Sequence, residues 1–276
     1  RDFTINALYA DPLTGEVIDH VGGEADILAR RVAFIGHPLA RIAEDHLRIL
    51  RFFRFHARFG QGAPDPAALD ACTRRANDLM ALSRERIADE LLKLLALPDP
   101  SPTLALIVER SILAPVLPEI VADAAARVAA LAIAETAAAI PAHPLRRLAA
   151  ILPSDAALAF KVATRLKLSK KARRRLADAA EPDLDRNPRV LAYRHGSGTA
   201  VDRLLLANRP ADAAAIAEWP LPRLPIGGGD LVARGVPQGP AVAARLRTIE
   251  AAWVAADFTT GSAFEALLSA ELAENR

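Results

Sequence analysis

The stretch from Arg41 to Arg58 decides the fold of this chain, and it reads Arg-Ile-Ala-Glu-Asp-His-Leu-Arg-Ile-Leu-Arg-Phe-Phe-Arg-Phe-His-Ala-Arg. Ile42, Ile49 and Phe53 recur at the spacing of an apolar helix face. We therefore expect one helix over these residues, mostly buried between its neighbours. The same stretch carries carboxylates and several guanidiniums, and charges are rarely buried without partners. The pattern thus indicates a buried helix that borders a cleft.

Asp45 and Arg48 are the first candidates for ligand contact, because side chains three residues apart leave the same side of a helix. A carboxylate only accepts hydrogen bonds and a guanidinium only donates them. Cytosine and adenine each offer an amino donor beside a ring-nitrogen acceptor, whereas uracil and guanine present the reverse order. The pair could therefore select C and A, at about 1–3 kcal/mol per base choice. The alternative, which the spacing alone favours, is an ordinary helical ion pair worth about 0.2–0.5 kcal/mol.

The composition is that of a globular, mainly helical chain. Of its 276 residues, 52% are hydrophobic, 25% are charged and 5% are aromatic, which excludes a disordered chain. A single cysteine, Cys72, excludes an internal disulfide and suits a reducing compartment, so we expect a cytoplasmic protein. No uncharged apolar run approaches the ~20 residues of a membrane span. Because the net charge is only +2, a polyanionic partner must be met by a local basic patch.

The order of the remaining segments predicts a small β-containing start followed by helices. Residues 3–20 are expected to form a β-hairpin, with a short helix over 24–29 and a short strand over 31–35. The helices that the pattern predicts after the opening stretch cover 67–81, 84–97, 104–110, 121–139, 145–152, 156–166, 170–179, 187–193, 201–207, 211–219, 241–256 and 264–273. Ser83 and Ser169 are expected to be N-caps. A lone hairpin is not stable and the chain lacks an initiator Met, so we expect its natural start upstream.

Four segments, taken together, resemble sequence blocks of the class II tRNA nucleotidyltransferase and poly(A) polymerase family. Residues 1–8 resemble the second block, and residues 22–27 resemble the third, hinge-like block. Residues 44–51 resemble the fourth block, which serves as a protein template for the incoming base, and residues 83–93 resemble the fifth. The four lie in the family's order within 93 residues, which makes the resemblance specific.

The resemblance implies a mainly α fold class with three parts. Residues 1–36 would be the C-terminal remnant of an α+β nucleotidyltransferase head, with its small β-hairpin. Residues 37–97 would be a helical neck that contains the nucleotide-reading helix. Residues 98–276 would form an all-helical body and tail that bind tRNA, although beyond residue 97 the resemblance is only general.

The activity implied by the resemblance is addition of CCA to tRNA 3′ ends from CTP and ATP. A bacterial poly(A) polymerase of the same family is an alternative, because an Asp/Arg reader accepts both C and A. A second alternative is a non-catalytic, helical RNA-binding module. No membrane partner is expected.

The resemblance also implies roles for individual residues. Asp45 and Arg48 match the family's base-reading pair, and Asp2 matches the residue that accepts a hydrogen bond from the ribose 2′-OH. Asn6 is expected to position its strand rather than to contact a ligand. The full set of residues that we assign to nucleotide binding is Arg1, Asp2, Asp45, Arg48, Arg51 and Arg54, of which the last two would reach phosphate.

The family's first block, which supplies the carboxylates for two metal ions, is absent from this chain. Two-metal nucleotidyl transfer needs those acids to hold the attacking and leaving oxygens. Asp11 in a turn and Asp19 at a strand end are expected to be structural. We therefore assign no catalytic residue and no metal ligand here, and expect Mg²⁺ to be bound by residues missing from the chain. The chain itself should bind parts of a nucleotide and tRNA but should not catalyse.

A basic stretch, Lys161 to Arg175, holds eight Lys and Arg residues and no acidic ones. It is either a solvated helix face or a patch that contacts RNA phosphates, which would make binding salt-sensitive. The sequence leaves both interpretations open. The residues that we assign to an RNA contact are Lys167, Lys170, Lys171, Arg173 and Arg174.

Overall fold

The computed structural model describes residues 1–182, 184 and 187–273, and the chain divides into two compact units. Unit 1 comprises Arg1–Asp183 and Asp202–Ala211, and unit 2 comprises Leu184–Val201 and Asp212–Arg276. The expected boundaries after residues 36 and 97 both fall inside unit 1 and stay predictions.

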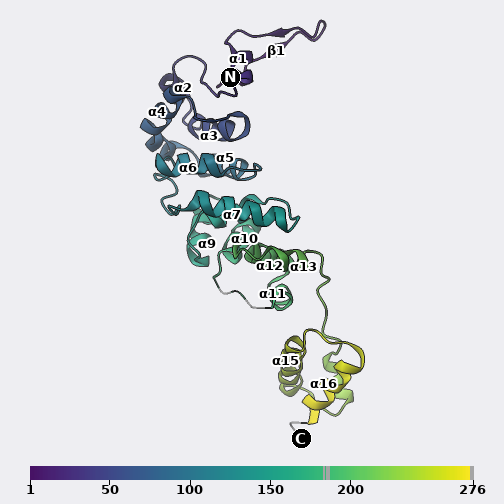
Figure 1. The fold of residues 1–276 in the computed structure, drawn as a ribbon. Helices are drawn as coiled ribbons and strands as arrows, with labels where there is room; N and C mark the ends of the chain where they lie inside the picture. The colour runs from purple at the N-terminus through teal and green to yellow at the C-terminus, as the bar shows by residue number, and fades with distance from the viewer. Residues whose placement is uncertain (183, 185–186, 274–276) are drawn as a thin grey trace. The chain divides into compact units, whose positions relative to one another are not determined.

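The mainly α fold class is confirmed, because helices follow one another along nearly the whole of the described chain (Figure 1). The helices are α1 Gly23–Leu28, α2 Pro38–Glu44, α3 Arg48–Phe59, α4 Pro66–Arg74, α5 Arg84–Leu95, α6 Ser101–Glu109, α7 Ala124–Ala137, α8 Pro144–Ala150, α9 Ala156–Arg165, α10 Lys170–Ala179, α11 Pro188–His195, α12 Ser197–Leu206, α13 Pro210–Ala217, α14 Gly228–Ala233, α15 Pro240–Ala255 and α16 Gly261–Ala273. Two 3-10 helices, η1 Thr4–Asn6 and η2 Ala76–Ala81, and two strands, β1 Tyr9–Ala10 and β2 Val17–Ile18, complete the list.

The β-hairpin is shorter than the sequence predicts. Its antiparallel register pairs Tyr9 with Ile18 and Ala10 with Val17. The preceding residues form η1 instead of continuing the strand, because the Asn6 side-chain carbonyl accepts a hydrogen bond from the Phe3 amide (3.3 Å). Asn and Asp side chains compete in this way with regular backbone pairing. Asn6 therefore lies in a tight turn, and its predicted place in a strand is wrong.

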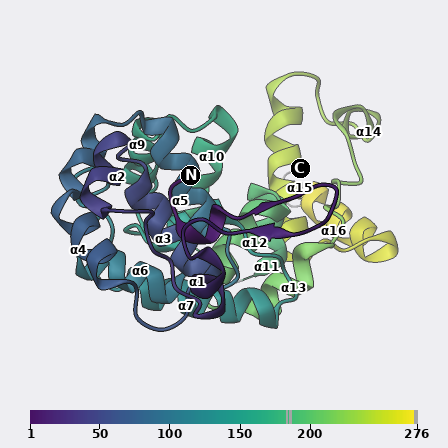
Figure 2. The same ribbon diagram turned by 90° about the horizontal axis from the view of Figure 1, so that it is seen from above.

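Phe3 packs the N-terminal segment against α3. Its ring, which is fully buried, lies 4.9 Å from that of Phe34 and 5.0 Å from that of Phe55, centroid to centroid. Phe3 also forms an isolated antiparallel bridge with Phe34, which is what remains of the strand predicted over 31–35. Both ribbon views accordingly show the first residues beside α3 (Figure 1 and Figure 2).

A close backbone approach fixes α1 against η1. A Cβ atom added at Gly23 would lie 2.4 Å from the carbonyl oxygen of Thr4, so a glycine is required there. The Thr4 hydroxyl then donates to Asp26 Oδ2 at 2.6 Å, within a buried contact. The hinge-like segment is thereby held to the start of the chain.

The single helix predicted over 41–58 is in fact two helices, and the break falls at Asp45. α2 ends at Glu44, Asp45 adopts an extended backbone (φ −156°, ψ 108°), and α3 begins at Arg48. Asp45 Oδ1 accepts from the Leu47 amide (3.1 Å) and its carbonyl accepts from the Arg48 amide (3.1 Å). A short carboxylate satisfies the first amides of a new helix better than it continues an old one. Asp45 and Arg48 therefore do not share one continuous helix face.

Other local predictions are confirmed by the hydrogen bonds that begin the helices. Ser83 Oγ accepts from the Arg86 amide (3.4 Å) at the start of α5, and Ser169 Oγ accepts from the Ala172 amide (3.2 Å) at the start of α10. The bounds of α10 match the predicted 170–179. The predicted helix over 67–81 is divided into α4 and η2.

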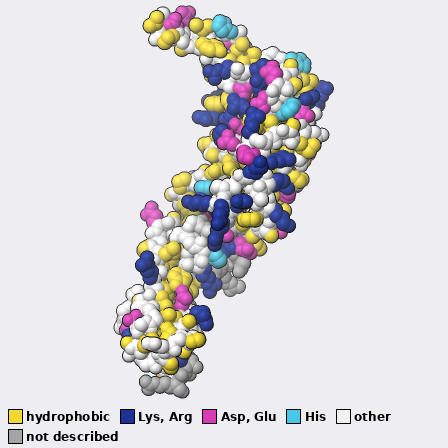
Figure 3. All heavy atoms as spheres, turned by 180° about the vertical axis from the view of Figure 1, so that it is seen from behind, with side chains coloured by type: hydrophobic (Ala, Val, Ile, Leu, Met, Phe, Trp, Pro, Cys, Tyr) yellow, Lys and Arg dark blue, Asp and Glu magenta, His cyan; other side chains and the backbone are white. Residues whose placement is uncertain are grey.

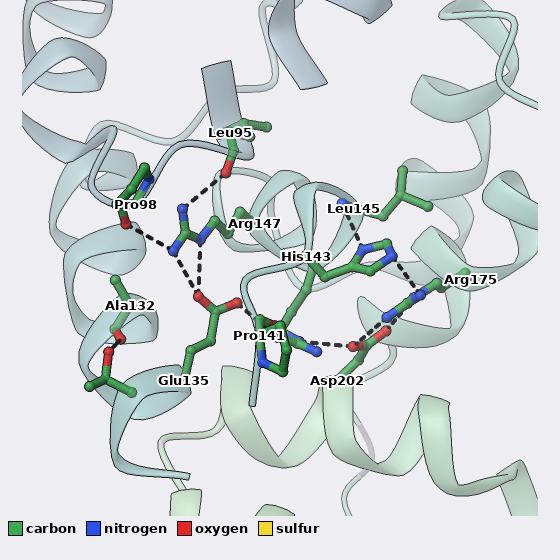
Figure 4. Close-up of polar contacts among 12 residues, drawn as sticks. Leu95, Pro98, Ala132, Glu135, Pro141, His143, Leu145, Arg147, Arg175 and Asp202 are labelled. Atoms are coloured by element: carbon green, nitrogen blue, oxygen red, sulfur yellow. Dashed lines mark hydrogen bonds and ion pairs between the residues drawn. The ribbon is translucent and has the colours of Figure 1, made fainter. Parts of the chain in front are cut away.

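A buried ionic network joins α7, α8, α10 and α12 (Figure 4). Arg146 Nη1 donates to Glu135 Oε1 and Arg146 Nε donates to Asp202 Oδ1, both at 2.8 Å. Arg175 Nε donates to the other oxygen of Asp202 at 2.7 Å. Glu135 and Asp202 are 3% and 0% exposed, so removing one partner would leave an uncompensated buried charge.

Arg147 extends this network to the end of α5. Its guanidinium bonds Glu135 Oε2 (2.9 Å for Nη2) and also donates to the carbonyls of Leu95 (3.0 Å) and Pro98 (3.1 Å). These carbonyls belong to a helix end and the following loop, where intrahelical donors are lacking. Arg147 therefore couples the segment that carries the predicted neck to the helices that follow it.

Unit 2 has an aromatic core of its own. Trp253 is 1% exposed and packs edge-on against Phe258 (5.1 Å) and Tyr193 (5.8 Å). The Trp253 indole N–H donates to the carbonyl of Thr259 at 2.7 Å, which satisfies its one polar atom. The remaining buried residues come from α11, α14, α15 and α16, and from Ile226 in the loop before α14.

Two histidines, the buried His56 and the half-buried His143, make the stability of the fold dependent on pH. Burial lowers the pKa of His56, and burial together with the neighbouring Arg175 lowers the pKa of His143, both from 6.5. The contribution of these two histidines to the free energy of unfolding is complete above the histidine pKa of the unfolded chain. It is lost as pH falls through the lower histidine pKa of the folded state. We expect urea unfolding to show a falling free energy of unfolding below about pH 6.5.

The variant His143→Asn should flatten this dependence, because asparagine keeps an N-cap acceptor at the start of α8 and does not titrate. The exposed His37→Asn is the matched control, since it lies at the start of α2. An unchanged slope between pH 6.5 and 5 in His143→Asn would contradict the assignment.

Candidate functional site

Asp2 lies at the centre of the first group of predicted nucleotide-binding residues. It is 6% exposed, and its Oδ1 accepts from Asn6 Nδ2 at 2.6 Å while its Oδ2 accepts from Arg51 Nε at 2.5 Å. Burial opposes ionisation, but the bonds from Arg51 and Asn6 outweigh it and hold the pKa of Asp2 below its usual 3.8. Asn6 thus positions the carboxylate, a role that its place in the sequence did not reveal.

Glu90, on α5, holds the two arginines of α3 that are predicted to reach phosphate. It is 3% exposed, accepts from Arg54 Nε at 2.6 Å and lies 3.8 Å from Arg51 Nη1. Both guanidiniums also lie over the ring of Phe55, at 5.4 Å for Arg51 and 4.8 Å for Arg54. The two cations are therefore held in fixed places by a buried carboxylate and an aromatic face.

Asp45 pairs with Arg86 of α5 and not with Arg48. Arg86 Nη2 donates to Asp45 Oδ2 at 2.8 Å, while Asp45 Oδ1 accepts from the Leu47 amide. Partial burial opposes ionisation of Asp45, but the bond from Arg86 outweighs it and lowers the pKa. Arg86 is a residue that the sequence analysis missed, although it lies within the block of residues 83–93.

Arg48 is held within its own segment. Its Nη1 donates to Glu44 Oε2 (2.7 Å) and to the Arg41 carbonyl (2.8 Å). The simple ion pair between Asp45 and Arg48 that the sequence allowed is therefore absent from the described hydrogen bonds and salt bridges of these two residues. Arg1 is exposed, and its carbonyl accepts a hydrogen bond from the Arg41 guanidinium.

The carboxylates of Asp11 and Asp19 bind backbone amides, as the structural interpretation expects. Asp11 Oδ1 accepts from Leu13 (2.7 Å) and from the next residue, which closes the hairpin turn. Asp19 accepts from Glu24 and from amides before α1, and these bonds lower its pKa to about 2. Within the described residues, no group of three or more His, Cys, Asp or Glu side chains could hold a metal ion.

The basic stretch mixes paired and exposed cations. Lys167 Nζ lies 3.0 Å from Glu85, Arg174 Nε lies 3.7 Å from its i+4 neighbour Asp178, and Arg175 belongs to the buried network. Lys170 and Lys171, in contrast, are exposed at the start of α10. On the face of the molecule drawn in Figure 3, Lys and Arg side chains are interspersed with Asp and Glu side chains.

No helix in the described part of the chain has the length and apolar character needed to cross a membrane.

Two family models match the chain. Residues 1–33 match the poly(A) polymerase head domain, and residues 63–123 match the probable RNA- and SrmB-binding site of polymerase A. The human mitochondrial CCA tRNA nucleotidyltransferase 1 is 42% identical over 97 residues, which are 34% of this chain and 22% of that protein. The CCA-adding enzyme of Bordetella bronchiseptica is 39% identical over 129 residues, 46% of this chain and 34% of that enzyme. The matched region is thus about a third or less of either relative.

Two solved structures share the fold over almost the whole chain. The CCA-adding enzyme of Bacillus stearothermophilus in complex with CTP superposes with a TM-score of 0.72 at 23% identity, covering 99% of this chain and 73% of that one. The Thermotoga maritima CCA-adding enzyme complexed with tRNA gives a TM-score of 0.71 at 18% identity, covering 100% and 72%. The helices beyond residue 123 therefore have counterparts in fold although they lie outside the residues that the two family models match.

We expect Glu90→Gln to lower the free energy of unfolding by several kcal/mol, of the order of the 3–5 kcal/mol that breaking a buried pair costs. The loss arises because Arg54 would keep its charge without its buried counterion, while Arg51 would retain only Asp2. Urea unfolding measures it, and the neighbouring exposed Asp89→Asn is the control, since its ion pair with Lys93 is worth about 0–1 kcal/mol. Equal effects of the two variants would contradict this role.

Proposed function

We propose that this chain, a member of the CCA-adding enzyme and poly(A) polymerase family, serves in a tRNA nucleotidyltransferase that adds CCA to tRNA 3′ ends from CTP and ATP. The observation that carries the proposal is the junction of α2 and α3, where an ionised carboxylate and a guanidinium lie three residues apart at Asp45 and Arg48. Both lie in the segment that resembles the family's base-reading block.

The proposed base choice depends on which lone pairs and N–H groups remain available. Each carboxylate oxygen can accept two hydrogen bonds, so Asp45 Oδ2 can receive Arg86 and still accept the amino group of C or A. Arg48 would exchange its contact with Glu44 for the ring nitrogen of the base. Uracil and guanine would place a carbonyl against the carboxylate and an N–H against the guanidinium, which strands polar groups in both cases.

The other assigned residues would bind the sugar and the phosphates. Asp2, ionised and fixed by Asn6, would accept from the 2′-OH, which favours a ribonucleotide. Arg51 and Arg54 would face the triphosphate, with Arg1 beside them at the start of the chain. The charges of Arg51 and Arg54 are already balanced by Asp2 and Glu90. The triphosphate would therefore bind arginines that already take part in internal ion pairs.

The proposed reaction would use Mg²⁺, which supplies charge stabilisation for the transferred phosphate in such transfers. The side chains of the described residues do not fit a metal site, since Asp11 and Asp19 are committed to backbone amides. We therefore assign no step through a metal to this chain. A cytoplasmic location stays a prediction from the single cysteine.

We expect Asp45→Ala, in the protein that carries this chain, to lower the preference for CTP over UTP about 5- to 150-fold, equivalent to about 1–3 kcal/mol. Triphosphate affinity should change less, because Arg51 and Arg54 are unaffected. Competition binding with all four nucleotides measures both, and the exposed Asp70→Ala is the control. Equal losses for all four nucleotides would rule out base reading by Asp45.

Extension of a tRNA that ends at the discriminator base separates the enzyme classes. Incorporation from CTP alone, followed by one ATP, is the outcome expected of a CCA-adding enzyme. Repeated incorporation from ATP alone, without use of CTP, would instead identify a poly(A) polymerase. Binding of RNA with no incorporation from either nucleotide would favour a non-catalytic module.

We also propose that the exposed part of the basic stretch contacts the tRNA backbone, with Lys170 and Lys171 supported by Lys167, Arg173 and Arg174. Each phosphate contact contributes about 0.9 to the slope of log affinity against log salt concentration. The double variant Lys170→Gln, Lys171→Gln should therefore reduce the slope for tRNA binding by nearly two. Lys93→Gln, which removes an exposed cation paired with Asp89, is the control, and an unchanged slope in the double variant would overturn the proposal.

A further inference from the structure

We propose that Arg86 is a positioning residue for base choice, because it sets the plane in which the Asp45 carboxylate meets the nucleobase. The inference rests on the proposed function, since it concerns the base-reading role of Asp45. It adds a residue from a different helix, 41 positions away in sequence, to the pair Asp45 and Arg48.

Arg86 is itself well placed to hold another side chain. Its backbone amide is bonded to the N-cap Ser83, which fixes the first turn of α5. From this turn its guanidinium reaches the junction of α2 and α3 and donates to Asp45 Oδ2 at 2.8 Å. The first turn of α5 therefore supplies the only side-chain donor to Asp45 among the hydrogen bonds of the described residues.

The Asp45 carboxylate needs such a contact because its own segment restrains it weakly. Rotation about the terminal torsion of an Asp side chain is broad, with no sharp staggered minimum. The Leu47 amide binds Oδ1 at 3.1 Å, which fixes one oxygen but leaves the other free to turn about that contact. The bond from Arg86 to Oδ2 fixes the second oxygen and so defines the plane.

Arg48 does not orient the Asp45 carboxylate, since the Arg48 guanidinium is bound to Glu44 and to the Arg41 carbonyl. The two members of the proposed base-reading pair are thus oriented independently. The acceptor Asp45 is held by α5, and the donor Arg48 is held by α2. A bidentate match to a base requires both to be aligned at once, and small misplacements of positioned groups are costly. Losing Arg86 should therefore damage discrimination between bases while leaving the other nucleotide contacts in place.

The Asp45–Arg86 pair is partly exposed, with 33% and 47% of the two side chains accessible. Exposed pairs of this kind contribute little to stability, so variants at Arg86 are expected to fold. Their thermal unfolding, compared with that of the parent protein, verifies this expectation.

The test is the ratio of CTP to UTP incorporation, and of their affinities, in the protein that carries this chain. We expect Arg86→Gln to lower the ratio about tenfold, a part of the full effect of one bidentate base contact. Arg86→Lys, which keeps the charge without the fork of the guanidinium, should recover part of the loss. Arg74→Gln removes an exposed arginine that also pairs with a carboxylate, and it should leave the ratio unchanged.

A double-mutant cycle with Asp45→Ala distinguishes positioning from an independent role. If Arg86 acts through Asp45, then Arg86→Gln causes no further loss of discrimination in the Asp45→Ala background. Additive losses would overturn the inference, as would an equal loss for all four nucleotides. If Asp45→Ala abolishes base choice while Arg86→Gln leaves it unchanged, the positioning role of Arg86 is wrong but the proposed function stands. If the parent protein does not discriminate C and A from U and G, both the positioning role and the proposed function are wrong.

Discussion

A carboxylate that is buried away from water needs a cationic partner, and this requirement determines how the helices of unit 1 pack. Glu90 and Glu135 are each 3% exposed, and each is held by arginines from a neighbouring helix. Glu90 fixes α5 against α3, and Glu135 fixes α7 against α8. Because an unpaired buried charge is so unfavourable, these ion pairs favour the relative register in which each carboxylate meets its arginine.

The same requirement shapes the candidate site. Asp2 is kept charged by Arg51 although it is buried, and Asp45 is kept charged by Arg86. Such a site presents acceptors and donors to a ligand in fixed places and needs little rearrangement of charge when the ligand arrives. The candidate site thus combines the proposed base-reading pair with a nearly balanced set of internal ion pairs, which would suit choice between nucleotides more than tight capture of any polyanion.

Local sequence signals predicted the helical pattern well, because caps and apolar spacing act over only a few residues. Ser83 and Ser169 begin their helices as expected, and α10 has its predicted bounds. The predictions were wrong where a side chain competes for backbone amides. Asp45 interrupts the predicted helix and Asn6 bends the predicted strand, because each satisfies local amides that a regular element would have used.

The sequence by itself determined the helical class, the order of the family-like blocks, and the presence of two carboxylates together with guanidiniums in the segment that resembles the base-reading block. Only the tertiary structure decided which charge meets which. Asp2 and Arg51 are 49 residues apart, Asp45 and Arg86 are 41 apart, and Arg54 and Glu90 are 36 apart. Spacing rules extend over about one helical turn, whereas these partners are chosen by the packing of the N-terminal segment and of α5 against α3 and the α2–α3 junction, so no local pattern could have assigned them.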